Sequence, residues 1–342
     1  MATALGDSPG RSEGAVTRRR FLGVASSAES NARHWLRLQR RAMACSFEIT
    51  LDQTDAAFVP AAQAALNEVD AIEAQLTVFR HTSAIVELNK RAASAETACD
   101  AELFALLSRC GELSRETDGA FDITSTPLSR CWGFLRREGR LPPDHEIAGA
   151  RDLVGMHHVR LDPQRSTVRF LKTGVELNLG AVGKGYALDR VAATLRHGGL
   201  DHALLSAGRS SMVGVGGRGR GWSIDLVSPR RVGAIARVWL RDAALGTSGA
   251  GTQFVMVDGR RYGHVLDPRS GRPAEGILSA TAICASAADA DALSTACLIG
   301  GPLLAQRYCE RHPEVLVLLT PDDDSSTTLV IGDSANAEVA EL

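Results

Sequence analysis

The amino-acid sequence predicts an α+β fold, with mixed or antiparallel sheets and flanking helices. Strand-like and helix-like segments follow one another in an irregular order along the chain. Several pairs of strand-like segments are separated only by short turns, which is typical of β-hairpins. A doubly wound parallel sheet would instead place a helix between most successive strands. The chain of 342 residues is long enough for one large domain or two moderate ones.

We expect one main domain over residues 38–330, between a flexible basic arm and a short tail. The arm, residues 1–37, is rich in Gly, Ser and Arg, and the tail covers residues 331–342. The stretch TRRRFLG in the arm resembles the start of a twin-arginine export signal. Such a signal continues with about 7–15 apolar residues, but here the chain soon turns polar. We therefore expect a cytoplasmic protein, although this stretch leaves export open.

Composition and charge argue against several classes of protein. The net charge of −2 provides no general attraction for nucleic acid, and an aromatic content of 5% argues against a surface that stacks bases. No apolar stretch approaches the ~20 residues of a membrane span. The seven cysteines are scattered without a CxxC pair, so a reducing compartment fits better than a disulfide framework.

The first half of the main domain predicts one strand followed by three helices. Residues 43–53 alternate enough between polar and apolar side chains to form a strand. Apolar residues then recur at helical spacing over three segments: 56–79, 83–93 and 101–119. Between residues 120 and 160 the chain is rich in Pro and Gly, and we expect a connection there.

The second half predicts mostly strands, together with two helices. Residues 159–180 suggest a hairpin with its turn at Asp162 and Pro163, and an amphipathic helix follows over 183–200. A second helix, rich in Ala and Leu, continues without a helix-breaking residue up to Gly300. The other segments are strand-like: 202–217, 221–229, 236–249, 260–273, 277–287 and 314–333.

The glycine pattern from Gly214 to Gly219 matches GxGxxG, which occurs in dinucleotide-binding proteins. That motif needs a strand before it and a helix after it. Here the following segment, residues 221–229, is strand-like. We therefore expect a glycine-rich hairpin turn at this position.

Two segments combine small residues with groups suited to phosphate or acid–base chemistry. In residues 176–189 a strand-like segment passes into a helix near Lys184, and backbone N–H groups at such a turn attract anions. Taken alone, this pattern is more typical of an ordinary strand-to-helix turn. In YGHVLDPRSGRP, His264 could act as a general base, although a lone histidine is more often structural.

Two aspartates lie in segments rich in apolar or small residues. Asp122 follows an aromatic residue in GAFDITSTPL, where a carboxylate usually caps or forms a turn. Asp291 and Thr295 are four residues apart in ADADALSTA and therefore share one face of a helix. A carboxylate and a hydroxyl there suit Mg²⁺, which takes oxygen ligands and keeps water and phosphate in its shell. A solvated or capping carboxylate is the alternative.

Taken together and in order, several segments resemble the ApbE family over about residues 40–318. They are MACSFEI, LTVFRHTSAIVELN, GAFDITSTPLSRCWGF, LNLGAVGKGYALDRV, TSG, GHVLDPRSGRP and ADALSTA. The resemblance implies an α+β fold of the family's own kind and an FAD:protein FMN transferase that binds FAD and Mg²⁺. Such an enzyme moves FMN from FAD onto a Ser or Thr hydroxyl of a target flavoprotein and releases AMP. Some members hydrolyse FAD to FMN and AMP instead.

The resemblance also implies roles for individual residues. Lys184 would approach the FAD phosphates, and His264 would activate the incoming hydroxyl, with Asp267 nearby. The ligands of Mg²⁺ would be the Ala181 carbonyl, Asp291 and Thr295. The residues in contact with FAD would be Met43, Phe79, Ala120, Phe121, Asp122, Asn178, Lys184 and Val265, with Ala120, Phe121 and Asp122 on the adenine side.

The sequence departs from the family pattern in three respects. The family usually has Asp at position 178, and Asn178 removes a negative charge near the cofactor, which would weaken one FAD contact. After the next strand the family commonly has Gly-Gly-Asp, whereas this chain has Gly208, Arg209 and Ser210. Arg209 either adds a cation near the flavin pocket or faces solvent. Many members also carry an export signal or membrane anchor, and the arm of this chain contains no convincing one.

Three functions are compatible with these motifs. The first is a transferase acting on a protein, the second an FAD pyrophosphatase with water as acceptor, and the third an FAD-binding protein without turnover. The presence of Asp291, Thr295 and His264 favours an enzyme. The expected partner is an acceptor flavoprotein, because no segment of this chain follows the Asp-x-x-Ser/Thr-Gly-Ala-Ser/Thr pattern that the family modifies.

Overall fold

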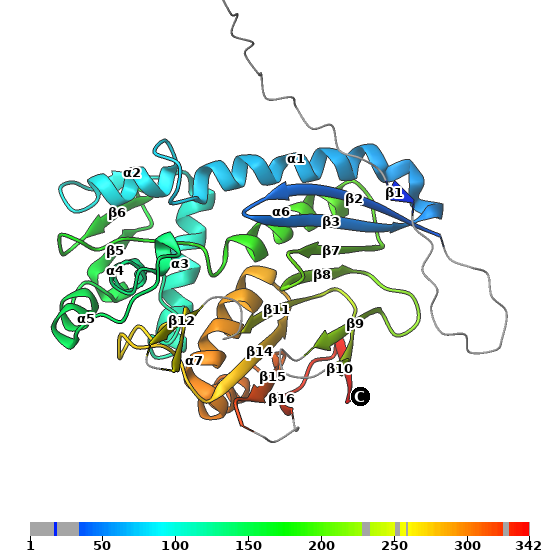
Figure 1. Cartoon of the computed structure of the whole chain (residues 1–342). Coiled ribbons are helices and arrows are strands. Elements are labelled where there is room, and N and C mark those ends of the chain that lie inside the picture. The colour runs from blue at the N-terminus through cyan, green and yellow to red at the C-terminus, as the bar shows by residue number, and fades with distance from the viewer. Residues whose placement is uncertain are drawn as a thin grey trace, which may run out of the picture.

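The computed structural model describes residues 17–18, 34–227, 233–249, 254–257, 259–323 and 328–341. A nine-stranded sheet forms the centre of the molecule (Figure 1), and all neighbouring strands in it are antiparallel. In spatial order its strands are β1 (Thr17–Arg18), β2 (Trp35–Ala42), β3 (Cys45–Asp52), β7 (Ala203–Ala207), β8 (Ser211–Val215), β11 (Ala243–Gly249), β14 (Ile277–Cys284), β15 (Leu316–Pro321) and β16 (Leu329–Gly332). Antiparallel sheets combined with helices confirm the α+β class.

Three long helices cover one face of the central sheet. They are α1 (Val59–Leu76), α6 (Gly183–His197) and α7 (Ala287–Arg311). Alternate side chains of β3, such as Phe47 and Ile49, point to this face and pack with Leu66 of α1 and Leu188 of α6. Helix α7 lies beside α6 and over β11, β14 and β15 (Figure 1). Hydrophobic burial between the helices and the sheet holds the start of α6 and the start of α7 side by side.

A small sheet covers part of the opposite face. Its strands, in spatial order, are β17 (Ala337–Glu341), β10 (Ala234–Leu240) and β9 (Trp222–Val227). Val238 of β10 packs in one buried cluster with Leu245 of β11 and Ile283 of β14. The middle strands of the central sheet are therefore buried on both faces.

The remaining elements lie mostly on one side of the molecule, beyond the end of α1 (left in Figure 1). The helices are α2 (Ala84–Arg91), α3 (Ala101–Glu116), α4 (Thr126–Cys131) and α5 (Asp144–Arg151). One small sheet has the strand order β4 (Thr97–Ala98), β6 (Thr167–Phe170) and β5 (Val159–Asp162). The other is the hairpin of β12 (Phe254–Val257) and β13 (Arg260–Gly263). Three short 3₁₀ turns are also described: η1 (Gln53–Phe58), η2 (Phe134–Arg136) and η3 (Met156–His158).

The connection expected between residues 120 and 160 contains the helices α4 and α5. They have only six and eight residues, and Pro127 is the second residue of α4, so neither shows a sustained helical period in the sequence. Leu128 of α4 and Ile147 of α5 pack with Trp132, which is fully buried. Tertiary packing around this indole, rather than local propensity, therefore stabilises both helices.

Helix α7 is longer than its sequence pattern indicated. It continues past Gly300 to Arg311, with a kink at Gly301, where φ is 67° and ψ is −162°. Glycine tolerates this conformation, and Pro302 can begin the second half of the helix because its missing N–H is not needed there.

The glycine-rich turn after β8 is not a hairpin turn, so that expectation is wrong. Strand β8 pairs with β7 and β11 in the central sheet, whereas β9 pairs with β10 in the small sheet. The segment from Gly216 to Gly221 thus carries the chain from one sheet to the other. Because a strand follows it, the dinucleotide-binding interpretation is excluded.

Parts of both expected terminal segments belong to sheets. Residues 35–37 of the expected arm lie in β2, and Thr17–Arg18 pair with this strand as β1, while the other residues before 34 lie outside the described ranges. In the expected tail, Ala337–Glu341 pair with β10 as β17. The tail therefore contributes to the cover of the central sheet.

All seven cysteines fall within the described ranges and are free thiols. Burial raises the pKa of every one of them, to about 11 at Cys99 and to about 12 at Cys297. No helix of the described residues is long and apolar enough to cross a membrane.

Candidate active site

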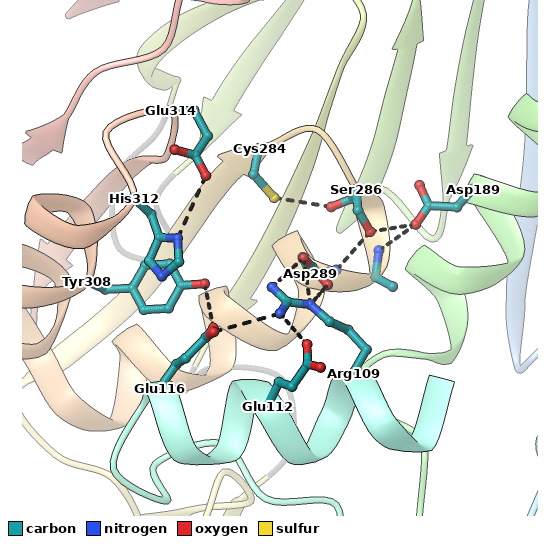
Figure 2. A network of polar contacts seen from close by, with 11 residues as sticks. Arg109, Glu112, Glu116, Asp189, Cys284, Ser286, Asp289, Tyr308, His312 and Glu314 are labelled. Atoms are coloured by element: carbon teal, nitrogen blue, oxygen red, sulfur yellow. Dashed lines mark hydrogen bonds and ion pairs between the residues drawn. The ribbon is translucent and has the colours of Figure 1, made fainter. Parts of the chain in front are cut away.

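The start of α7 is fixed in place by α3 and α6 (Figure 2). Asp189 of α6 accepts hydrogen bonds from the backbone N–H groups of Ala287 and Ala288, at 2.8 and 3.0 Å, and from the Ser286 hydroxyl at 2.8 Å. These contacts satisfy N–H groups that a helix leaves unpaired at its first turn. From the other side, Arg109 of α3 forms an ion pair of 2.9 Å with Asp289. Asp289 is therefore a structural residue.

Asp291, one turn further along α7, faces the central sheet and is only 5% exposed. Its Oδ1 accepts a hydrogen bond of 2.6 Å from the Ser211 hydroxyl of β8, and its Oδ2 accepts one of 2.8 Å from the Gly185 N–H of α6. Burial raises the pKa of this carboxyl group to about 6, although the positive charge of Lys184 acts in the opposite direction. A buried carboxylate with lone pairs left over is suited to bind a cation.

Two glycines allow α7 to come close enough for these contacts. A Cβ atom on Gly185 would lie 2.0 Å from the Ala287 carbonyl oxygen, and one on Gly246 of β11 would lie 2.4 Å from the Ala290 carbonyl carbon. Backbone therefore meets backbone on two sides of the first turns of α7. No larger residue fits at either position without moving the helix.

Hydroxyl groups surround the next turn of α7. Ser248 of β11 lies at hydrogen-bond distance, 2.9 Å, from both Ser294 and Thr295. The Thr295 hydroxyl also donates to the backbone carbonyl of Asp291 at 3.2 Å. Gly246 and Ser248 share the face of β11 that meets α7, because alternate residues of a strand point the same way. The structure thus brings together a carboxylate and several neutral oxygens, which is the donor chemistry that Mg²⁺ prefers.

The third expected metal ligand, Ala181, lies in the turn that precedes α6. Both Val182 and Gly183 donate backbone hydrogen bonds to the Leu179 carbonyl, at 3.1 and 2.7 Å, which closes a tight turn around Ala181. No group of three or more His, Cys, Asp or Glu side chains gathers to bind a metal among the residues that the structure describes. A metal held here would therefore depend on one carboxylate together with hydroxyl and carbonyl oxygens.

Lys184 connects the region of Asp291 with an open pocket of about 250 Å³. Its ammonium group donates a hydrogen bond of 2.5 Å to the Ser210 hydroxyl at the β7–β8 turn. This hydrogen-bond partner is neutral, and the charge of Lys184 also acts on the nearby Asp291 carboxyl group. The pocket is lined by Met43, Ala44, Glu73, Leu76, Thr77, Val78, Phe79, Asn178, Leu179, Gly180, Gly183 and Lys184.

This pocket joins four of the predicted site residues from distant parts of the chain. Met43 lies in the tight turn between β2 and β3 with a φ of 48°, and the side chain of Phe79 after α1 is highly exposed, at 75%. Asn178 accepts a hydrogen bond of 2.8 Å from the Gly180 N–H and shapes the chain before Lys184. An exposed aromatic ring, a flexible methionine and a cation are suited to a ligand with a planar ring and phosphate groups.

Asp122 forms a turn, which is the usual role of a carboxylate in such a segment. It is 8% exposed, and it accepts hydrogen bonds from the Thr124 N–H and hydroxyl, at 2.8 and 2.5 Å, and from the Met156 N–H at 2.9 Å. The side chains of Ala120 and Phe121 are almost completely buried in the main core. Asp122 lines a second pocket of about 470 Å³, whereas Ala120 and Phe121 are not among the residues that line it.

His264, Val265 and Asp267 follow β13 in one continuous segment. The Asp267 carboxylate forms an ion pair of 2.8 Å with Arg269, and its carbonyl accepts a hydrogen bond from Gly271 at 2.7 Å. Asp267 is thus engaged in holding the turn that follows His264. The Val265 carbonyl accepts a hydrogen bond from Ala274 at 2.9 Å, and its side chain packs against the main core.

Several residues that build the site were not singled out from the sequence. Ser211 and Ser248 hold Asp291 and Thr295, and Asp189 caps α7. Ser248 and Asp189 lie within two of the motif segments, but no role was assigned to any of the three residues from the sequence. What distinguishes Ser211 is its position in the sheet, because it lies directly opposite Gly246 in the β8–β11 register. Arg209, the departure noted above, is exposed and has a φ of 65°, so it faces solvent rather than the core.

Fold and site together define an α+β protein with a buried carboxylate, a ring of hydroxyl groups and a lysine at the meeting point of two helices. The chain belongs to the ApbE family, whose model matches residues 43–319. This match confirms the family that the sequence motifs indicated.

Individual relatives agree with this assignment. The chain is similar to the FAD:protein FMN transferase of Treponema pallidum, with 31% identity over 265 residues, which cover 71% of this chain and 73% of that protein. The FAD:protein FMN transferase of Escherichia coli (strain K12) is 28% identical over 269 residues, covering 76% of this chain and 77% of that protein. The crystal structure of the ApbE protein from Thermotoga maritima matches with a TM-score of 0.76 and 29% identity, covering 84% of this chain and 94% of that chain.

Proposed function

We propose that this protein is a Mg²⁺-dependent FAD:protein FMN transferase. It moves FMN from FAD onto a Ser or Thr hydroxyl of an acceptor flavoprotein and releases AMP. Membership of the ApbE family and the names of the relatives support the overall reaction. The observation that carries the metal dependence is the buried Asp291 carboxylate beside Thr295 and Lys184.

The residues at the start of α7 fit a magnesium ion. Asp291 supplies a carboxylate with free lone pairs, Thr295 a hydroxyl, and the turn around Ala181 a backbone carbonyl. A cation there would also offset the cost of burying the Asp291 charge. When bound, Mg²⁺ would neutralise charge on the FAD diphosphate and stabilise the departing AMP.

Lys184 and His264 supply the remaining chemistry in this proposal. The Lys184 ammonium group, held by a neutral hydroxyl, attracts the FAD phosphates and reduces their repulsion of an incoming oxygen. His264 takes the proton from the acceptor hydroxyl as its oxygen attacks the FMN phosphorus and the bond to AMP breaks. Met43, Phe79, Asn178, Asp122 and Val265 hold FAD in position for this attack, and Asp267 supports the turn behind His264.

The test is to incubate purified protein with FAD, with and without Mg²⁺, and to quantify AMP, FMN and the mass of an acceptor peptide. The peptide carries the Asp-x-x-Ser/Thr-Gly-Ala-Ser/Thr pattern. Mg²⁺-dependent AMP release with FMN added to the peptide is the expected result. AMP together with only free FMN would instead identify a pyrophosphatase, and intact FAD in every sample would identify a binding protein without turnover.

A further inference from the structure

The hairpin of β12 and β13 has one anchored face and one exposed face. On the anchored face, Val255 and Tyr262 pack against the cluster around Trp132, and the Tyr262 and Trp132 rings lie 5.7 Å apart. On the other face, Phe254 and Met256 are 46% and 54% exposed. Alternation along β12 produces this division, since successive side chains of a strand point to opposite faces.

A cation completes the exposed face. Arg261 lies opposite Met256 in the strand register, and its guanidinium group is placed over the Phe254 ring at 4.0 Å. The three side chains of Phe254, Met256 and Arg261 form a small apolar surface with a positive charge at its edge, which we name the hairpin surface. Apolar side chains that cluster on a surface are a feature of contact sites, and methionine adapts readily to different partners.

Along the chain, the hairpin lies between Ser248 of the candidate site and His264. Gly263, the last residue of β13, pairs with Phe254, and His264 is the next residue of the chain. Toward the other end, only six positions separate Ser248, beside Thr295, from Phe254, so they are at most about 22 Å apart. Figure 1 shows the hairpin as two short yellow strands.

We propose that the hairpin surface is where the target segment of the acceptor protein docks. This inference rests on the proposed function, because only a protein substrate needs such a surface. The hairpin surface adjoins His264 along the chain, so a segment that presents its hydroxyl to His264 can extend across this surface. Three extended residues span about 10 Å, and Phe254 and Met256 lie opposite Gly263 and Arg261, which are one and three residues before His264.

The chemistry of the surface determines the segment it accepts. Phe254 and Met256 favour an apolar side chain, and the guanidinium of Arg261 favours a carboxylate through charge-assisted hydrogen bonds. The occupant is thus an extended segment that carries an acidic and an apolar residue close to the modified Ser or Thr. A short segment suits the limited size of the hairpin, because an extended peptide can lie along a strand.

Kinetics with the acceptor peptide test this proposal. The variants Phe254→Ser and Met256→Ser should each raise the KM for the peptide by about 10-fold, as expected for loss of a central contact residue. FAD affinity and the kcat at saturating peptide should stay within about twofold. The control is Leu303→Ser, which removes a side chain that is 75% exposed on α7 and should leave the KM unchanged.

Charge reversal tests the role of Arg261 separately. Arg261→Glu should raise the KM for the acidic peptide. For this variant, and not for the unaltered protein, replacing the acidic residue of the peptide by Lys should lower the KM again. A loss caused only by altered folding would not be rescued by the second peptide.

The outcomes separate this proposal from the proposed function. If the unaltered protein transfers FMN to the peptide but Phe254→Ser and Met256→Ser leave the KM unchanged, the docking site is overturned and the transferase stands. If the unaltered protein splits FAD but transfers FMN to no peptide, the transferase is overturned, and the docking proposal with it.

Discussion

The Asp291 carboxyl group carries an electrostatic cost in the metal-free protein. Its folded pKa of about 6 lies above the value near 3.9 of an unfolded aspartate. The folded state therefore holds this proton more tightly, and stability falls as the pH rises between these two values. The difference corresponds to at most about 3 kcal/mol at neutral pH. A buried site that carries this negative charge near neutral pH favours the binding of a cation.

The variant Asp291→Asn measures this cost. In EDTA, lowering the pH from 7 to 4.5 should stabilise the unaltered protein relative to the variant by about 2 kcal/mol, because only the unaltered protein takes up the proton. Urea unfolding at several pH values measures the difference. At pH 7, added Mg²⁺ should then stabilise the unaltered protein and not the variant, and turnover of the variant should no longer respond to Mg²⁺. If Mg²⁺ stabilised both proteins equally, Asp291 would not be a ligand of the metal.

His264 is expected to act on the reaction and not on binding. His264→Ala should lower the rate of FMN transfer by roughly 10²–10⁴-fold, the usual contribution of a general base. FAD binding, followed by the change in flavin fluorescence, should change little. A variant that lost FAD binding as well would show that His264 contacts the cofactor or supports the fold.

At the scale of elements, the site depends on how closely α6, β11 and α7 approach one another. Gly185 and Gly246 allow two backbone contacts that no side chain could replace. The cap from Asp189 and the ion pair from Arg109 hold the same turns of α7 from outside the site. The oxygen atoms of Asp291 and Thr295 are therefore positioned by four separate elements.

A pair of glycine variants tests this arrangement. Gly185→Ala should destabilise the protein by more than about 1 kcal/mol and weaken its response to Mg²⁺, because the new Cβ atom would overlap the Ala287 carbonyl oxygen. Gly149→Ala in α5 is the matched control, since nothing lies within 4 Å of its added Cβ atom. This control should gain up to about 1 kcal/mol from better helix propensity. Thermal unfolding of both variants measures the contrast, and equal behaviour would contradict the close-contact explanation.

The sequence predicted elements where periodicity was strong and missed those that depend on distant packing. The hairpin of β5 and β6 and the helices α3 and α6 follow from local patterns. Helices α4 and α5 do not, because they exist only around the buried Trp132. The change of sheet after β8 was also missed, since a glycine-rich turn between two strands looks the same in sequence whether or not those strands pair.

The candidate site shows the same limit. Asp291 and Thr295 could be placed on one face because both belong to one helix. The contacts of Ser211 and Ser248 with this helix could not be predicted, because the register between two strands does not follow from the sequence of either strand alone. The role of Asp122 as a turn former was open in the sequence and is decided by its partners in space.

At the scale of the whole molecule, the central sheet is covered by helices on one face and by a small sheet on the other. The C-terminal strand β17 is the outer strand of that small sheet, and Val339 packs against its buried cluster. The candidate site residues of α6 and α7 lie on the opposite face of the central sheet. The small sheet with β17 therefore stabilises the molecule from the face opposite the candidate site residues of α7.

Shortening the chain after Asp333 tests this separation. Loss of β17 should lower the unfolding temperature by at least about 4 °C, because β10 loses its partner and Val339 its packing. Mg²⁺-dependent turnover measured well below that temperature should persist. Glu338→Gln is the control, because it removes only an exposed ion pair with Arg220 and should shift the temperature little. Loss of activity without loss of stability would show that the two faces are coupled.

Four of the seven free cysteines are buried and three are partly buried, and this affects how the protein responds to oxidants. Thiols react with oxidants and with disulfides mainly as thiolates, and each raised pKa reduces the thiolate fraction at neutral pH. The fold neither needs a disulfide bond to form nor offers a readily ionised thiol to attack. We therefore expect the thiols to stay unmodified in both reducing and oxidising glutathione buffers. Storage stability and activity should then not depend on added reductant.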